Sequence, residues 1–195
     1  MEPEDIFYAA EDYVRTTTNN LVSRKATVHG PQNVSIKGKG IVMPGVTLHG
    51  DLATIRFGRY CLVDEGSTIR PGVRLEQGSG AAAAADANAK AAVTRHHTPM
   101  LVGNHTHIGR GCVVEAAAIG CNVTVGDGCV LGANCIIKDN CIIEAGTVLP
   151  PGAVVPPFTR VHGKPGLAVG EVPESFAVVQ PERAIAFFNN FKRIS

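Results

Sequence analysis

The chain has 195 residues, a formal net charge of +1 and only 5% aromatic residues, with no Trp. This balanced charge argues against nucleic acid or an anionic membrane surface as a partner. No stretch approaches the roughly 20 apolar residues that cross a bilayer, so direct membrane insertion is not expected. The length favours one domain, and the scarcity of aromatic residues favours a narrow core without room for large rings.

Residues 1–35 have no clear repeat, and we interpret them as an N-terminal lead-in and cap. Within them, the segment from Tyr13 to Arg24 is rich in residues that favour strands, so it is expected to be extended.

A period of six begins in residues 36–75. Aliphatic or aromatic residues open each hexad, and mostly small residues take its fifth place. The openers are Val42, Leu48, Phe57, Val63, Ile69 and Leu75, with three extra residues before Phe57. The fifth places hold Val46, Leu52, Cys61, Ser67 and Val73.

Residues 76–99 break the period. Their Ala-rich centre has no apolar face, and glycines precede it, so we expect an insertion loop thrown out at a corner. His96 and His97 close this segment, and we interpret them as a solvated loop end.

The period returns in residues 100–166. The openers are Val102, Ile108, Val114, Ile119, Val125, Leu131, Ile137, Ile143, Leu149, Val155 and Val161. Six fits neither the helical period of 3.6 nor a two-faced strand. It fits a chain that turns a corner every six residues and stacks on itself, as in hexapeptide solenoids. Both runs therefore predict one all-β fold, a left-handed parallel β-helix in the form of a triangular prism, capped so that its sheet edges are protected. The left hand follows from the known fold of this repeat and not from the residues themselves.

Residues 167–195 are predicted to form a C-terminal extension with an α-helix. Pro181 suits the first helical turn, and Glu182 suits the positive end of the helix dipole. Phe187, Phe188 and Phe191 cannot all face the same way. The helix therefore either packs on its own prism or presents one of these rings to a partner.

Five of the six cysteines fall on fifth places: Cys61, Cys112, Cys129, Cys135 and Cys141. Their spacing follows the repeat, so we expect small buried side chains and no metal or redox site. Cys121 sits at a corner and could be exposed. Six unpaired thiols favour a reducing compartment, in agreement with a cytoplasmic protein.

Two segments resemble the γ-class carbonic anhydrase family of hexapeptide proteins: HGDLATIRFGRYCLVDEGSTIR, from His49, and HIGRGCVVEAAAIG, from His107. That resemblance implies zinc ligands at Arg70, Arg110 and Glu115, but two of these are permanent cations that would repel a metal dication. The family also has an Asp, an Arg and a Gln near its metal site. Here the Asp is present as Asp51, but His49 stands in the place of the Arg and Asp64 in the place of the Gln. The sequence thus predicts the frame of this family without its metal, catalytic site or cofactor. A charged cluster of Arg70, Arg110, Glu115 and Asp64 could replace the metal if their corners meet.

Other enzymatic alternatives have less support. His105 and His107 lie two residues apart and could hold a metal, but no third ligand is evident. A hexapeptide acyltransferase needs a histidine base beside an acyl-coenzyme A pocket, and no neighbouring motif distinguishes one here.

A closer resemblance covers nearly the whole chain. The segments NNLVSR, GKGIVMPGVTLHGDLATIRFGRYCLV and STIRP, and above all GTVLPPGAVVPPFTRVHGKPGLAVGEVPE with its two Pro-Pro steps, resemble the dynactin subunit 5 family. The Ala-rich insertion is longer than that family's linker. The resemblance implies a non-catalytic scaffold in the pointed-end complex of dynactin, which supports dynein activation and cargo linkage in the cytoplasm and cytoskeleton. It implies a hetero-oligomer with dynactin subunit 6, the pointed-end actin-related protein and dynactin subunit 4.

Overall fold

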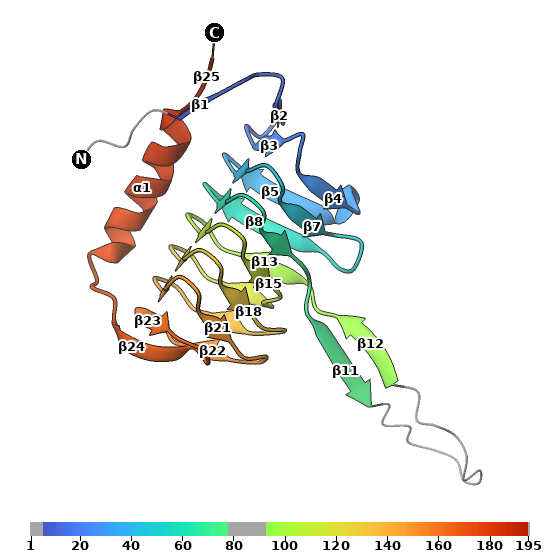
Figure 1. Cartoon of the computed structure of the whole chain (residues 1–195), viewed down its shortest axis with the longest axis vertical. Coiled ribbons are helices and arrows are strands. Elements are labelled where there is room, and N and C mark those ends of the chain that lie inside the picture. Colours follow the sequence, from blue (N-terminus) through green and yellow to red (C-terminus); the bar gives the residue numbers. More distant parts are fainter. Residues whose placement is uncertain (1–5, 78–92, 195) are drawn as a thin grey trace, which may run out of the picture.

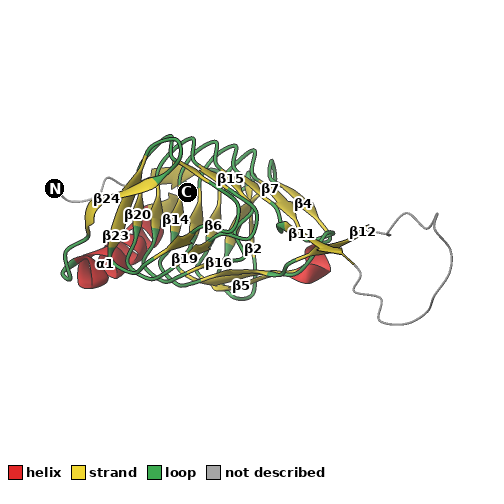
Figure 2. Cartoon of the chain, turned by 90° about the horizontal axis from the view of Figure 1, so that it is seen from below, coloured by secondary structure: helices red, strands yellow, loops and turns green. Residues whose placement is uncertain are grey.

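The computed structural model describes residues 6–77 and 93–194 and confirms the predicted fold. The chain winds into a left-handed parallel β-helix of about six coils, with a single α-helix alongside (Figures 1 and 2). Each coil contributes one short strand to each of three sheets, which form the faces of a triangular prism. None of the helices in the described ranges is long and apolar enough to span a membrane.

The strands of each face follow one another in the order of the chain. Along the first face lie β3 (Leu21–Ser23), β6 (Ile41–Val42), β9 (Leu62–Val63), β14 (His107–Ile108), β17 (Thr124–Val125), β20 (Ile142–Ile143) and β23 (Thr159–His162). The second face contains β4 (Thr27–His29), β7 (Thr47–His49), β10 (Thr68–Ile69), β15 (Val113–Val114), β18 (Val130–Leu131) and β21 (Val148–Leu149). The third face contains β5 (Val34–Gly38), β8 (Ile55–Arg59), β13 (Met100–Val102), β16 (Ala118–Ile119), β19 (Ile136–Ile137) and β22 (Val154–Val155).

The hexad openers form the core. In β19, Ile137 points to the axis and pairs with Ile119 and Val155 of the neighbouring coils, whereas Ile136 points outward. Every predicted opener from Val102 to Val161 is buried, as are those from Val42 to Ile69. Each opener thus stacks on similar side chains one sheet spacing, about 4.8 Å, above and below.

Two predicted fifth-place residues are not in the core, and the predicted opener Leu75 lies in a strand outside the prism. Leu52 lies in the longer turn before β8 and is only partly buried. Val73 is exposed, and it begins the strand β11 (Val73–Gln77), which also contains Leu75. This strand pairs antiparallel with β12 (Val93–His97), and the hairpin projects away from the prism (Figure 1). The period therefore ends at Ile69, and most of the Ala-rich segment lies outside the described residues.

The solenoid begins inside the segment expected to be its lead-in. β3 and β4 already belong to the first coil, and β3 pairs in parallel with β6. β2 (Tyr13–Arg15) turns back and pairs antiparallel with β3, which covers this edge of the first face. Between β4 and β5 lies a short 3₁₀ turn, η1 (Pro31–Asn33).

The other end of the prism is closed by the chain itself. β24 (Leu167–Glu171) folds back antiparallel on β23. A Cβ placed on Gly166 would approach the side chains of Thr147, Leu149 and Val161 within 3.2 Å, so this residue lies directly over the last coil. Leu149 and Val161 are consequently buried although no further coil follows.

Helix α1 (Phe176–Asn190) corrects the predicted start at Pro181, which is instead inside the helix. The first turn is made by residues 176–178, whose amides bond three residues back, to Pro173, Glu174 and Ser175. The ring of Pro181 removes one hydrogen bond in the second turn. After the helix, β25 (Phe191–Arg193) pairs in parallel with β1 (Ile6–Tyr8), so the first and the last described strands meet beside the first face.

Candidate functional site: a charged corner, a helix-covered face and an open coil

The residues that match the lost zinc ligands occupy two corners. Arg70 follows β10 and forms an ion pair with Glu115, which follows β15 on the adjoining coil of the same face. Arg110 instead follows β14 of the first face, and its Nε lies 3.7 Å from Oδ2 of Asp64. The structure therefore forms two separate ion pairs within one chain and not a single charged cluster.

Asp64 has a lowered pKa although it is partly buried. Burial alone raises the pKa of a carboxyl group, but the nearby imidazole of His107, the amide of Glu65 and the guanidinium of Arg110 together lower the pKa of Asp64 by more than burial raises it. The Glu65 N–H donates to Oδ1 at 2.9 Å, and Nε2 of His107 lies 3.8 Å from Oδ2. Asp64 is therefore ionised at neutral pH and ties the corner of β9 to that of β14.

His105 and His107 have different surroundings. The ring of His105 stacks on Tyr60, with centroids 5.6 Å apart, and burial lowers its pKa. His107 faces Asp64 on the first face. Over residues 6–77 and 93–194, no group of three His, Cys, Asp or Glu side chains could hold a metal ion.

The three phenylalanines proposed as partner contacts all lie against the chain's own first face. Phe191 is only 6% exposed and stacks on Tyr8, with ring centroids 4.8 Å apart. Phe187 stacks on Phe191, and Phe188 meets Tyr60 edge to face. The helix instead leaves Val178 exposed, at 62%.

The cysteines have the environments expected of repeat positions. All five fifth-place thiols are buried, and Cys121 is partly buried. Burial raises the pKa of Cys61 to about 11 and that of Cys135 to about 12. The thiols of Cys112 and Cys129 donate to the backbone carbonyl oxygens of Gly126 and Glu144, each at 3.1 Å, and both side chains are fully enclosed.

The first coil is the open end of the prism. Its axial residues Val22, Val28, Val34 and Ile36 are only partly buried, and they line a hollow of about 410 Å³. Within the described parts of the chain, β4 pairs only with β7 and β5 only with β8. One edge of each strand therefore presents unpaired backbone groups beside an apolar hollow, which favours pairing with another strand.

Our sequence interpretation missed this coil, although a signal was present. Val22 and Val28 are six residues apart and pair in register with the openers Val42 and Leu48. The residue that pairs with the next opener, Phe57, is Ile36, which comes eight residues after Val28, so the irregular step hid the pattern.

These features define a protein of the hexapeptide-repeat class, with one closed and one open end and with ion pairs at two of its corners. Within that class, the chain belongs to the dynactin subunit 5 family, whose model matches residues 1–194. It is 38% identical to "Dynactin subunit 5" of Dictyostelium discoideum over 191 residues, which cover 98% of this chain and 89% of that protein.

Solved structures share the fold at low sequence identity. A hexapeptide transferase family protein from Anaplasma phagocytophilum superposes with a TM-score of 0.63 at 18% identity, covering 97% of this chain and 96% of that one. A mutant of AntD, an N-acyltransferase from Bacillus cereus solved with dTDP and coenzyme A, gives a TM-score of 0.54 at 11% identity, covering 86% and 89%. At these identities the likeness concerns the architecture alone.

Proposed function

We propose that this chain is a non-catalytic scaffold subunit of dynactin that joins a neighbouring subunit through its open first coil. The observation that carries the proposal is the contrast between the two ends of the prism. The last coil is covered by Gly166 and β24, whereas the axial valines of the first coil remain partly buried beside unpaired strand edges.

The geometry of the open end favours a particular kind of partner. The exposed edges belong to two parallel, in-register sheets, and another hexapeptide coil would continue both and fill the hollow with its own axial residues. We therefore place dynactin subunit 6 at this end. We place the pointed-end actin-related protein and dynactin subunit 4 elsewhere on the prism, within a hetero-oligomer of the cytoplasm and cytoskeleton that supports dynein activation and cargo linkage.

The absence of catalysis is part of the same proposal. A zinc enzyme of the γ-carbonic anhydrase type needs three neutral or anionic ligands, and here Arg70 and Glu115 neutralise each other while Arg110 is engaged with Asp64. The alternatives, a zinc enzyme of this type or another hexapeptide-repeat enzyme, would require a site built from other residues.

The test is purification of the tagged chain from its own cells, followed by sizing and mass spectrometry. We expect a large particle that contains actin-related proteins and a second hexapeptide subunit. Val28→Lys, which puts a charge into the open hollow, should lose the hexapeptide partner. The matched variant Val130→Lys changes an exposed outward position on the second face and should keep it. Recovery of the wild-type chain as a lone homotrimer would contradict the proposal and call for zinc analysis and carbon dioxide hydration assays.

A further inference from the structure

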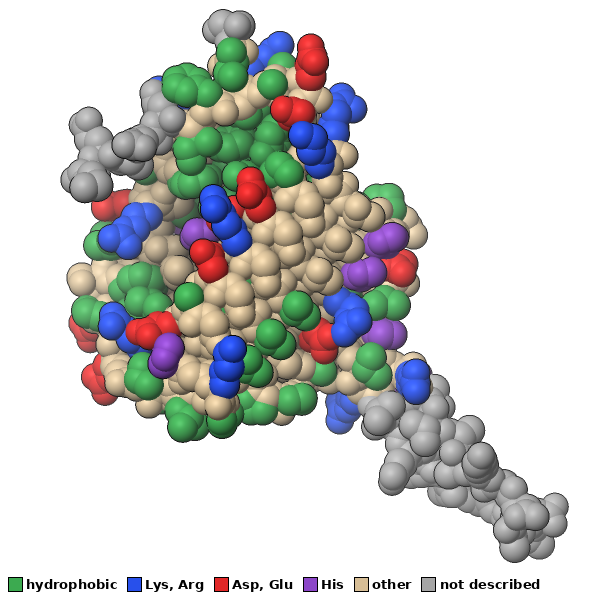
Figure 3. All heavy atoms as spheres, in the orientation of Figure 1, with side chains coloured by type: hydrophobic (Ala, Val, Ile, Leu, Met, Phe, Trp, Pro, Cys, Tyr) green, Lys and Arg blue, Asp and Glu red, His purple; other side chains and the backbone are tan. Residues whose placement is uncertain are grey.

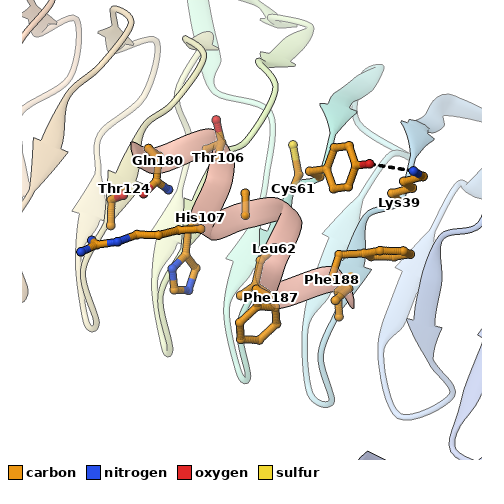
Figure 4. Close-up of a pocket in the computed structure, with 13 residues that line it drawn as sticks. Lys39, Cys61, Leu62, Thr106, His107, Thr124, Gln180, Phe187 and Phe188 are labelled. Atoms are coloured by element: carbon orange, nitrogen blue, oxygen red, sulfur yellow. Dashed lines mark hydrogen bonds between the residues drawn. The ribbon is translucent and has the colours of Figure 1, made fainter. Parts of the chain in front are cut away.

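A cavity of about 180 Å³ lies between α1 and the first face, where the helix stands off the sheet (Figure 4). Leu62, His107 and Thr124 are outward-facing residues on three successive coils and line its floor. Phe187, Phe188 and Gln180 line it from the helix. This volume is below the roughly 300–1,000 Å³ of sites for drug-sized ligands, so the cavity suits a small molecule.

The lining of this helix cavity combines apolar side chains, such as Leu62 and Phe187, with positive charge. Lys39 and Arg183 line it, whereas no carboxylate of the described residues does. Nζ of Lys39 donates to the Tyr60 hydroxyl at 2.7 Å, and neither Lys39 nor Arg183 forms an ion pair with a described acid. Nε2 of His107 lies 3.8 Å from the carboxylate of Asp64, so the uncompensated positive charge of the lining comes from Lys39 and Arg183. These two cations favour an anion at their ends of the cavity.

The rim of the cavity is also built from strained backbone. At the corner that leads into the first face, one residue per coil has a left-handed backbone, with φ between 55° and 59°. The residues of this column are Asn19, Lys39, Tyr60, His105, Asn122, Asn140 and Phe158. Asn and His adopt this conformation more often than other residues, whereas Lys, Tyr and Phe rarely adopt it.

Two of the three unfavourable residues, Lys39 and Tyr60, lie on consecutive coils, and both line the cavity. Nζ of Lys39 lies 4.9 Å from the centre of the Tyr60 ring, and Tyr60 in turn stacks on His105. Backbone strain tends to persist where a side chain has a function that a less strained residue cannot supply. The two side chains that line the cavity here are a cation and a flat ring, which would suit a flat ligand with a negative charge.

We propose that the helix cavity binds a small amphipathic monocarboxylate. The guanidinium of Arg183, with the hydroxyl of Thr124 nearby in the lining, receives the carboxylate. The flat apolar body lies against Leu62 and Phe187, and Tyr60 with Lys39 closes the far end. This inference concerns a ligand of the chain itself and holds whether or not the scaffold proposal is correct.

The test uses phenylacetate and its neutral analogue phenylacetamide, which have nearly the same shape. Binding to the full chain is measured by calorimetry and by saturation-transfer NMR. We expect saturable binding of phenylacetate, and binding of phenylacetamide that is weaker by about tenfold, because charge-assisted hydrogen bonds are about twice as strong as neutral ones. Arg183→Gln should weaken the binding of phenylacetate by a similar factor and leave the binding of phenylacetamide unchanged. The matched variant Arg56→Gln changes an exposed cation on the third face and should alter neither.

Arg183 is exposed, so its replacement should not prevent folding, and an unchanged thermal transition would verify this. Equal affinity for the two probes would overturn the proposal, since the site would then not select an anion. Absence of saturable phenylacetate binding up to about 10 mM would also overturn it, because even a modest ligand efficiency would give measurable binding there. A wild-type affinity in Arg183→Gln would refute the assigned role of the guanidinium.

Discussion

Replacement of Ile137 by Ala tests the hexad register directly. Ile137 is 1% exposed and packs between Ile119 and Val155 of the adjoining coils. The change removes three buried carbons, which is about 2.4 kcal/mol at about 0.8 kcal/mol each. The solenoid cannot easily close the gap, since its stacked sheets fix the spacing. The cavity that remains adds to this cost, so we expect the free energy of unfolding to fall by about 3–4 kcal/mol.

The matched variant is Ile136→Ala, which makes the same chemical change one residue earlier in the same strand. Ile136 points outward, so its loss should cost no more than about 1 kcal/mol of packing and strand preference. The assay is urea unfolding followed by circular dichroism and by a second probe, because a solenoid can lose cooperativity. Equal losses for the two variants, or a larger loss for Ile136→Ala, would refute the assigned register.

Three further predictions concern charges and thiols. A double-mutant cycle on Arg70 and Glu115 should give a coupling energy below about 1 kcal/mol, because Arg70 is half exposed and solvent screens the pair; a coupling above about 2 kcal/mol would contradict this. Asp64→Asn should lower the free energy of unfolding at pH 7. Because the folded-state pKa of Asp64 is lowered, its contribution is present above the unfolded value of about 3.9 and disappears as pH falls through the folded value. Wild type and variant should therefore converge in acid unfolding, and a constant difference at all pH values would argue against the ion pair. Under native conditions a thiol reagent should label only Cys121 rapidly, since the other five cysteines are buried, and Cys121→Ser should abolish the fast phase; a second fast thiol would disagree with this burial.

The core was predictable from the sequence because one physical constraint repeats. A residue such as Ile119, Ile137 or Val155 occupies the same axial place in each coil, so the period itself identifies the buried positions. The prediction failed where that constraint ends. Val73 and Leu75 continue the count of six, but the chain has already left the prism for the hairpin.

Residue preferences within short segments did not predict where the helix begins or which charged residues form ion pairs. Pro181 is favourable in a first turn, but the helix begins earlier, and contacts such as the Gln180 amide donating to the His105 carbonyl at 3.4 Å hold it on the prism. From the resemblance to the γ-class carbonic anhydrases, the sequence predicted Arg70 and Arg110 at ligand positions of one former metal site. Here they follow strands of different faces, which only the winding of the chain determines.

The regular pairing of the last coils shows that each coil there uses the same number of residues. Thr124 pairs with Ile142, and Val130 with Val148, so in both cases the partner lies eighteen residues further along the chain (142 − 124 and 148 − 130). Deleting or duplicating such a unit would shift everything beyond it by one sheet spacing, about 4.8 Å, and leave the three faces aligned. A subunit built this way could have its length adjusted in whole steps while both of its ends keep their shape.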